Sequence, residues 1–271
     1  MRAAAQLRGL RGFIVDLDGT TYVGDRLIPG AHEFFDTLHR TERRHVFVTN
    51  NSSKSGDLFE NALRRLGLDV ADGQVLTSGE ATAMFLAKRG DRRVYVVGTP
   101  ALEMEMARAG FVVGPHNPDC VVLGYDRTLT YDKLETAARL IQRGTPFVAT
   151  HPDRVCPTDD GYVPDCGAMI ALLQAATGVS PLVVGKPEPL LAQMALAKLG
   201  LEPSQVAVIG DRLYTDMEMG HRAGTMTILV LSGETTTAMV EEARRAPDIV
   251  VPDLLALVSA IEPRMPRELT A

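Results

Sequence analysis

Short runs of β-branched and other apolar residues alternate with longer amphipathic segments along almost the whole chain. The short runs are apolar on both faces, as central parallel strands are. They cover residues 13–15, 46–48, 94–97, 120–123, 147–148, 182–184, 206–209 and 227–230. Between them, the segment from Pro187 to Gly200 has its apolar residues on one stripe, which predicts a helix with a proline start and a glycine stop. The alternation predicts an α/β fold with parallel sheets.

Length and charge narrow the class of protein. The chain has 271 residues, of which 45% are hydrophobic and 23% charged, so a largely disordered chain is excluded. The formal net charge of −6 argues against a general nucleic-acid coat or a polybasic membrane binder. The negative net charge does not exclude anionic substrates, because a binding site needs only local positive charge.

The cysteines and the N-terminal segment indicate a compartment. Three cysteines without a CxxC pair argue against a disulfide framework and against a structural zinc site. The N-terminal segment lacks the apolar stretch of a signal peptide, and no apolar run reaches the ~18–20 residues of a membrane span. We expect a cytoplasmic protein with reduced thiols, without nucleic-acid or membrane partners.

Four of the predicted strands end in residues that can do chemistry. In open parallel sheets the ligand crevice lies beyond the carboxyl ends of the strands. The four endings are Asp16-Leu17-Asp18-Gly19-Thr20, Thr49-Asn50-Asn51-Ser52, Gly185-Lys186-Pro187, and Gly210-Asp211 with Asp216 five residues on.

Asp16 and Asp18 are two apart on an extended chain, so both carboxylates can face one site while Leu17 points away. Such a pair can divide its labour, with one carboxylate attacking as nucleophile and the other moving a proton. The alternative is a helix cap or an Asp turn, which is common for Asp after a strand.

Asp211 and Asp216 would form a repulsive cluster if they stood together with the first pair of carboxylates. A divalent cation resolves that conflict, and Mg²⁺ prefers oxygen ligands. The alternative for Asp216 is that it caps a helix beginning near Met217.

Lys186, between glycine and proline at a strand end, could neutralise a phosphoryl group in transfer. The alternative for it is a solvated loop lysine. The segment from Thr49 to Ser53 supplies hydroxyl, amide and backbone donors just before a predicted helix that starts near Lys54, a good place for an anion. Taken alone, this segment favours ordinary helix capping by Ser or Asn.

The ordered set DxDGT, TNNS, GKP and GDxxxxD resembles the haloacid dehalogenase (HAD) superfamily of phosphohydrolases, and within it the NagD-like, p-nitrophenylphosphatase-type branch. The likeness runs from about Gly12 to Pro252, and no P-loop, GxGxxG, HExxH or GxSxG pattern competes with it. The resemblance implies Asp16 as nucleophile and Asp18 as general acid and base. It also implies a phosphoryl-binding set consisting of Thr49 and Lys186, helped by Asn50 and Asn51.

The same resemblance implies a magnesium site. Its ligands would be the Asp16 carboxylate, the Asp18 backbone carbonyl and Asp211. Asp216 would orient Lys186 or the waters of the metal.

The spacing of the motifs predicts an inserted domain. Only 33 residues separate Asp16 from Thr49, but 137 separate Thr49 from Lys186, far more than one crossover of ~12–30 residues needs. We therefore expect a Rossmann-like parallel-sheet core of residues 1–79 and 180–271 and an α/β domain of residues 80–179. In the family that the chain resembles, this insertion is a C2-type cap that closes over the site.

Three cap residues are predicted to influence substrate choice: Tyr125, Cys156 and Asp165. Tyr125 follows a cap strand, and the other two lie in a long polar loop between His151 and Gly167 that resembles the specificity loop of the family. The alternatives are a half-buried aromatic for Tyr125 and inert packing for Cys156.

We thus expect a Mg²⁺-dependent phosphatase that cleaves a small phosphate monoester, such as a nucleotide or sugar phosphate, through an aspartyl-phosphate. A homodimer would be unsurprising. The alternative is a catalytically idle ligand-sensing or interaction protein on the same fold.

Overall fold

The chain forms two compact units. The computed structural model describes residues 2–158 and 161–261. The first unit combines the residues up to His45 with those from Leu199 onward, and the second runs from Val46 to Lys198. The predicted domain boundaries near Gly79 and Ser180 both lie in the second unit and stay a prediction.

The first unit is built on parallel strands in the order β15-β14-β13-β1. Their bounds are β1 Gly12–Asp16, β13 Val206–Gly210, β14 Met226–Val230 and β15 Ile249–Val251. A small antiparallel pair, β2 (Tyr22–Val23) and β3 (Arg26–Leu27), follows β1. The helices are α1 Arg2–Gly9, α2 Ala31–Arg40, α9 Glu218–Ala223, α10 Thr237–Glu241 and α11 Leu255–Ile261, with a 3₁₀ turn at Pro203–Gln205 and a π-helical turn at Leu213–Met217.

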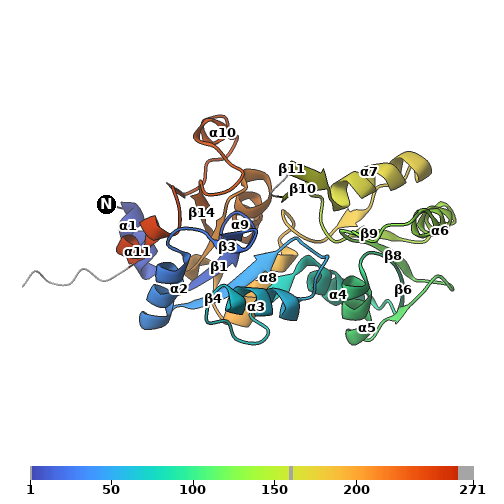
Figure 1. The fold of residues 1–271 in the computed structure, drawn as a ribbon, viewed down its shortest axis with the longest axis horizontal. Helices are drawn as coiled ribbons and strands as arrows, with labels where there is room; N and C mark the ends of the chain where they lie inside the picture. Colours follow the sequence, from blue (N-terminus) through green and yellow to red (C-terminus); the bar gives the residue numbers. More distant parts are fainter. Residues whose placement is uncertain (1, 159–160, 262–271) are drawn as a thin grey trace, which may run out of the picture. The chain divides into compact units, whose positions relative to one another are not determined.

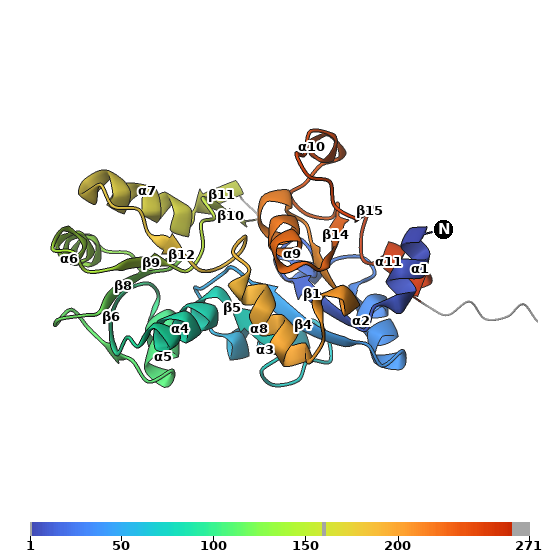
Figure 2. The same ribbon diagram turned by 180° about the vertical axis from the view of Figure 1, so that it is seen from behind.

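The second unit contains a five-stranded parallel sheet in the order β12-β9-β8-β6-β7. In both views α6 and α7 lie on one face of this sheet and α4 and α5 on the other (Figures 1 and 2). The sheet strands are β6 Arg93–Val97, β7 Val112–Val113, β8 Cys120–Leu123, β9 Phe147–Ala149 and β12 Leu182–Val183. The helices on its faces are α4 Ser78–Arg89, α5 Pro100–Arg108, α6 Tyr131–Gln142 and α7 Cys166–Thr177.

Further elements of the second unit lie outside that sheet. Strand β4 (Arg44–Thr49), whose first two residues belong to the first unit, pairs in parallel with β5 (Val75–Thr77). Strands β10 (Val155–Thr158) and β11 (Gly161–Pro164) form an antiparallel hairpin. The remaining helices are α3 Gly56–Arg65 and α8 Leu190–Leu199.

Helix ends in the second unit follow capping chemistry. The Thr77 hydroxyl accepts a hydrogen bond from Glu80 N–H at the start of α4, and the Asp165 side chain accepts one from Cys166 N–H at the start of α7. Gly90 and Gly178 end these two helices in the left-handed conformation that favours glycine. The local sequence therefore dictates where these two helices begin and end.

The predicted fold class is confirmed, because every one of the eight apolar runs forms a strand and the main sheets are parallel. The central strands β1 and β13 are buried along their whole length, as two-sided apolar runs require. The short strands β5, β10, β11 and β15 were not expected from the sequence. In the part of the chain that the structure describes, no helix is long and apolar enough to cross a membrane.

Candidate active site

Asp16 is the last residue of β1 and is only 6% exposed. Its neighbour Leu17 is fully buried, whereas Asp18 is partly exposed, so the two residues after the strand point to different surroundings. The Thr21 hydroxyl donates to the backbone oxygen of Asp16 at 2.7 Å, and Gly19 turns the chain with φ 85°. The chain continues into the β2–β3 pair, so the helix-cap alternative for the aspartates is wrong.

A cluster of three buried carboxylates forms at this end of the first unit. Oxygen atoms of Asp16, Asp211 and Asp216 all lie within 4.8 Å of one another. Three anionic groups this close and this buried repel one another unless a cation or protons lie among them. An all-oxygen donor set of this kind suits Mg²⁺. The residues present therefore fit the predicted metal site, with Asp216 inside the cluster.

The Asp211 carboxylate is enclosed by backbone from two loops. Glu234 N–H donates to its Oδ2 at 2.7 Å, and the Thr20 hydroxyl lies 3.4 Å from its Oδ1. A Cβ on Gly19 would lie 2.5 Å from Oδ2, and one on Gly233 would lie 2.0 Å from it. Both positions therefore need glycine. The Gly233–Glu234 loop was not predicted as part of the site, although its position shortly after strand β14 was a usable signal.

Asp216 does not cap a helix. It lies within the π-helical turn Leu213–Met217, and its Oδ2 accepts a hydrogen bond from Arg212 N–H at 3.2 Å. A Cβ on Gly210 would lie 2.3 Å from the Asp216 Cγ, so the glycine before Asp211 lets the two carboxylates approach. The capping alternative is thus wrong, because the carboxylate turns back toward the end of β13.

In the second unit, Asn50 and Lys186 are joined although 136 residues separate them. Lys186 N–H donates to Asn50 Oδ1 at 2.8 Å, and Asn50 Nδ2 donates to the Lys186 carbonyl at 3.0 Å. Lys186 is 3% exposed and Asn50 5% exposed, so both belong to the interior. The alternative of a solvated loop lysine is therefore wrong.

The loop after β4 folds on its own side chains. The Thr49 hydroxyl accepts a hydrogen bond from Asn51 N–H at 3.0 Å. Asn51 Oδ1 in turn accepts from the Ser53 N–H at 3.0 Å and from the Ser53 hydroxyl at 2.7 Å. Helix α3 begins only at Gly56, after Ser55, whose side chain makes no capping hydrogen bond. The helix-capping alternative for Thr49-Asn50-Asn51-Ser52-Ser53 is wrong, because these side chains shape the loop instead.

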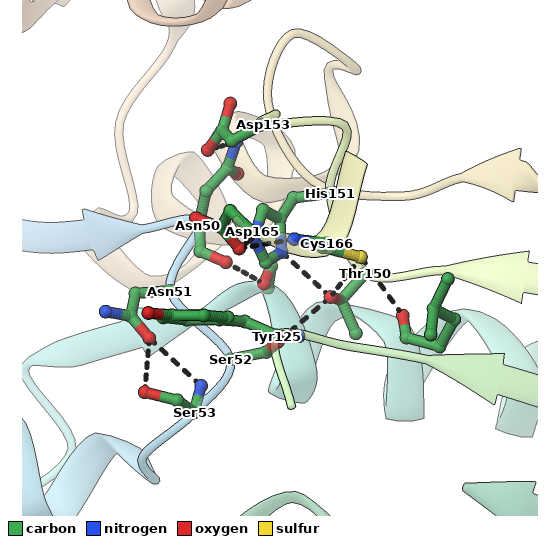
Figure 3. Close-up of polar contacts among 12 residues, drawn as sticks. Asn50, Asn51, Ser52, Ser53, Tyr125, Thr150, His151, Asp153, Asp165 and Cys166 are labelled. Atoms are coloured by element: carbon green, nitrogen blue, oxygen red, sulfur yellow. Dashed lines mark hydrogen bonds and ion pairs between the residues drawn. The ribbon is translucent and has the colours of Figure 1, made fainter. Parts of the chain in front are cut away.

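A second buried polar cluster lies in this unit, and of its members only Asp165 was predicted from the sequence as a site residue. It consists of His151, Asp153 and Asp165, whose ligand-type atoms lie within 4.8 Å of one another. His151 Nε2 lies 2.9 Å from Asp165 Oδ1, and Nδ1 lies 2.8 Å from the Thr150 hydroxyl (Figure 3). The polar residues directly after strand β9, Thr150 to Asp153, were the sequence feature that could have indicated this cluster.

This cluster is continuous with the loop after β4. The Thr150 and Ser52 hydroxyls are 3.0 Å apart, and Tyr125 N–H donates to the Ser52 oxygen at 3.0 Å (Figure 3). On the other side, Asn50 Nδ2 lies 3.1 Å from Asp153 Oδ2. Polar groups from four separate segments therefore form one buried network.

Two of the three predicted specificity residues, Tyr125 and Cys156, lie at the same hydrophobic core of the second unit. Tyr125 is 4% exposed and belongs to that core, so it is more buried than the half-buried aromatic considered as its alternative. Burial raises the pKa of its hydroxyl to about 12. Cys156 is partly buried against the core, and Asp165 caps α7.

Comparisons with known proteins agree with this architecture. A family model described as haloacid dehalogenase-like hydrolase matches residues 13–112, and a second HAD-hydrolase-like model matches residues 183–257. An acid sugar phosphatase of Staphylococcus haemolyticus is 35% identical over 258 residues, which cover 94% of this chain and 98% of that protein.

Solved structures give the same result. The 4-nitrophenylphosphatase of Thermotoga maritima matches with a TM-score of 0.92 and 44% identity, covering 95% of this chain and 99% of that one. A glycerol phosphate phosphatase of Mycobacterium tuberculosis in complex with magnesium matches with a TM-score of 0.87 and 35% identity, covering 93% and 78%.

The chain therefore belongs to the HAD-like hydrolase family. Within it, the similar structures are NagD and p-nitrophenylphosphatase proteins, which confirms the predicted branch. The prediction of a phosphatase enzyme is likewise confirmed.

Proposed function

We propose that this phosphatase uses Mg²⁺ and hydrolyses a small phosphate monoester, of the sugar-phosphate or polyol-phosphate class, through a phosphoryl group held covalently on Asp16. The observation that carries the proposal is the buried carboxylate cluster of Asp16, Asp211 and Asp216 at the end of β1 and β13. The substrate class is supported by the names of the relatives, which are an acid sugar phosphatase, a 4-nitrophenylphosphatase and a glycerol phosphate phosphatase.

The two aspartates after β1 have complementary roles in this proposal. A carboxylate oxygen of Asp16 attacks phosphorus, the ester P–O bond breaks, and Asp18 gives its proton to the departing alkoxide. Asp18 then takes a proton from water, whose oxygen attacks the same phosphorus and releases Asp16 as a carboxylate with inorganic phosphate. The partial exposure of Asp18 is compatible with this proton exchange.

Charge on the phosphoryl group is met by Lys186 and by the Thr49 and Asn51 loop. Asp16, the Asp18 backbone carbonyl and Asp211 would hold Mg²⁺, with Asp216 beside them, and the bound ion supplies positive charge for the phosphoryl oxygens. Burial of the three carboxylates supports this assignment, because it makes their mutual repulsion costly without a cation.

The proposal is tested by assaying the purified chain with p-nitrophenyl phosphate and Mg²⁺, and then with a panel of phosphorylated metabolites ranked by kcat/KM. The panel contains sugar phosphates, glycerol phosphate, nucleoside monophosphates, phosphoglycolate and pyridoxal phosphate. We expect hydrolysis that EDTA abolishes and that added Mg²⁺ restores. Full activity in EDTA would remove the metal from the proposal, and no hydrolysis of any compound would favour the idle ligand-binding alternative.

We also propose that Tyr125, Cys156 and Asp165 influence substrate choice. The position of Tyr125 and Asp165 in the network of Figure 3 supports this assignment, as does the packing of Cys156 against the same hydrophobic core as Tyr125. Tyr125→Phe and Cys156→Ser should change the order of substrates in the panel. If both variants keep the wild-type order, the assignment of these two residues fails.

A further inference from the structure

The Asn50 carboxamide uses both of its N–H donors and its oxygen within the protein. Its Nδ2 lies 3.0 Å from the Lys186 carbonyl oxygen and 3.1 Å from Asp153 Oδ2, and its Oδ1 accepts from Lys186 N–H at 2.8 Å. A primary amide has two N–H hydrogens, so two such acceptors use both of them. A side-chain hydrogen bond from Asn50 to a phosphate would require breaking one of these contacts.

The contacts with Lys186 are bidentate. The carboxamide binds both the N–H and the C=O of the same residue, which fixes the backbone from which the lysine side chain extends. The packing leaves no slack, because a Cβ on Gly185 would lie 2.6 Å from Asn50 Oδ1 and 2.5 Å from the Thr150 carbonyl oxygen. Asn50 itself is held by Ser78, whose hydroxyl donates to the Asn50 carbonyl at 2.5 Å.

The third contact joins Asn50 to the hairpin β10–β11. Asp153 lies just before β10, and its backbone oxygen accepts from Gly167 N–H at 2.6 Å. Asp165 N–H donates to the Arg154 carbonyl at 3.0 Å, so the two ends of the hairpin are tied together here. A charge-assisted hydrogen bond from Nδ2 to the Asp153 carboxylate orients the carboxamide plane for the contacts with Lys186.

We propose that Asn50 is a positioning residue for Lys186, and that its carboxamide acts on the reaction through that lysine and not by touching the substrate. This inference rests on the proposed function, in which Lys186 binds the phosphoryl group. Fixed supporting groups matter at such sites, because a charged donor displaced by about 1 Å loses much of its effect.

A double-mutant cycle separates positioning from direct contact. The four proteins are wild type, Asn50→Ala, Lys186→Ala and the double variant, each measured for kcat/KM with p-nitrophenyl phosphate and for the Kd of inorganic phosphate by calorimetry. We expect Asn50→Ala to lower kcat/KM by ~10²-fold in the wild-type background and by less than ~3-fold when Lys186 is already alanine. Phosphate affinity should follow the same pattern. An equal loss in both backgrounds would overturn the proposal, since Asn50 would then act on the substrate itself.

The Asp153 contact is tested by reversing its direction. Asn50→Asp alone places a carboxylate against Asp153 and should impair activity at least as much as Asn50→Ala. Adding Asp153→Asn returns a donor to this pair but not the N–H that bonded to the Lys186 carbonyl, so we expect a partial recovery of kcat/KM, of at least ~3-fold. No recovery, with both variants melting within a few degrees of wild type, would mean that Asp153 does not orient Asn50.

Asn61→Ala is the matched control, because Asn61 is an exposed asparagine of α3 that bonds only to its neighbour Arg64 among the contacts described. It should behave as wild type in every assay. Failure of the proposed function itself looks different: wild type would then hydrolyse no ester, while the phosphate Kd would still report whether Asn50 acts through Lys186.

Discussion

The two buried acidic clusters of this protein differ in what surrounds their carboxylates. In the first unit, Asp16, Asp211 and Asp216 bring three carboxylates within 4.8 Å of one another. In the second unit, Asp153 and Asp165 are also buried. The Asn50 amide bonds to the Asp153 carboxylate, and the His151 imidazole bonds to the Asp165 carboxylate. Each of these two carboxylates has a side-chain hydrogen-bond partner supplied by the chain.

The cluster of Asp16, Asp211 and Asp216 is therefore the one whose composition favours a bound cation. The first cluster joins three carboxylates, whose mutual repulsion a cation would relieve, whereas the second joins only two carboxylates, with an imidazole among them and an amide against Asp153. The first cluster is therefore suited to metal-assisted chemistry, and the second to holding the hairpin and Lys186 in place.

The largest effect should come from the first cluster. Asp16→Asn removes the proposed nucleophile and should lower kcat for p-nitrophenyl phosphate by about 10⁴-fold or more, while the protein remains folded. The measurement is a steady-state assay with a melting curve. Asp36→Asn is the control, because Asp36 is an exposed aspartate of α2. Wild-type rates in Asp16→Asn would remove the nucleophile from this cluster.

The second cluster should respond in stability. Asp165→Ala leaves the His151 ring and the Cys166 N–H without their carboxylate inside the protein, so we expect a loss of about 3 kcal/mol in the free energy of unfolding. Urea unfolding measures it. Asp132→Ala, an exposed aspartate in the first turn of α6, should cost less than about 0.5 kcal/mol. Equal losses for both variants would mean that the buried cluster has no special structural role.

Magnesium should distinguish the two clusters directly. At a Mg²⁺ concentration about 100 times its Kd, the free energy of unfolding should rise by about 2.7 kcal/mol, because the ion binds only the folded state. This gain should disappear in Asp211→Asn and persist in Asp165→Asn. Loss of the stabilisation by Mg²⁺ in Asp165→Asn, or its retention in Asp211→Asn, would contradict the assignment of the ion to the first cluster.

Glu105 on α5 is an intermediate case and should give the smallest effect. Its Oε1 accepts from the Thr77 hydroxyl at 3.1 Å, while no donor among the described residues reaches its buried Oε2. Burial, only partly offset by Thr77, raises the pKa of Glu105 from 4.5 to about 7. Between these two pH values the folded state binds more protons than the unfolded state, so stability should fall as pH rises. The shift corresponds to at most about 3 kcal/mol, which the partial exposure of Glu105 reduces to on the order of 2 kcal/mol.

Glu105→Gln should remove that part of the pH dependence. Urea unfolding at pH 4.5 and pH 8 measures it, with Glu33→Gln on the exposed face of α2 as the control. A variant that keeps the full wild-type loss of stability over this range would show that another group titrates there.

Local pattern explains what could be predicted. The apolar runs that became β1, β4 and β13 were recognisable, because strand residues buried on both faces must be apolar. The polar residues directly after these strands could also be predicted as site residues, because the ends of the strands were recognisable. The sequence did not reveal the roles of His151 and Asp153, because their partners come from segments about 14 and 103 residues away.

The capping alternatives failed for a related reason. Ser, Asn and Asp are the residues that cap helices and also the residues that bind ligands or shape loops, so residue type alone leaves both readings open. Only the fold decided that Asp216 lies inside a π-helical turn and that Asn51 bonds to Ser53.

By itself, the amino-acid sequence determined the α/β class, the strands and the identity of the carboxylates after β1 and β13, since these depend on periodicity and neighbouring residues. The tertiary structure decided what each polar group contacts: the Asn50 carboxamide binds Lys186 and Asp153, and Asp211 receives Glu234 N–H. Hydrogen bonds act over about 3 Å, and those of Asn50 join residues more than 100 positions apart, so they exist only once packing has brought those segments together.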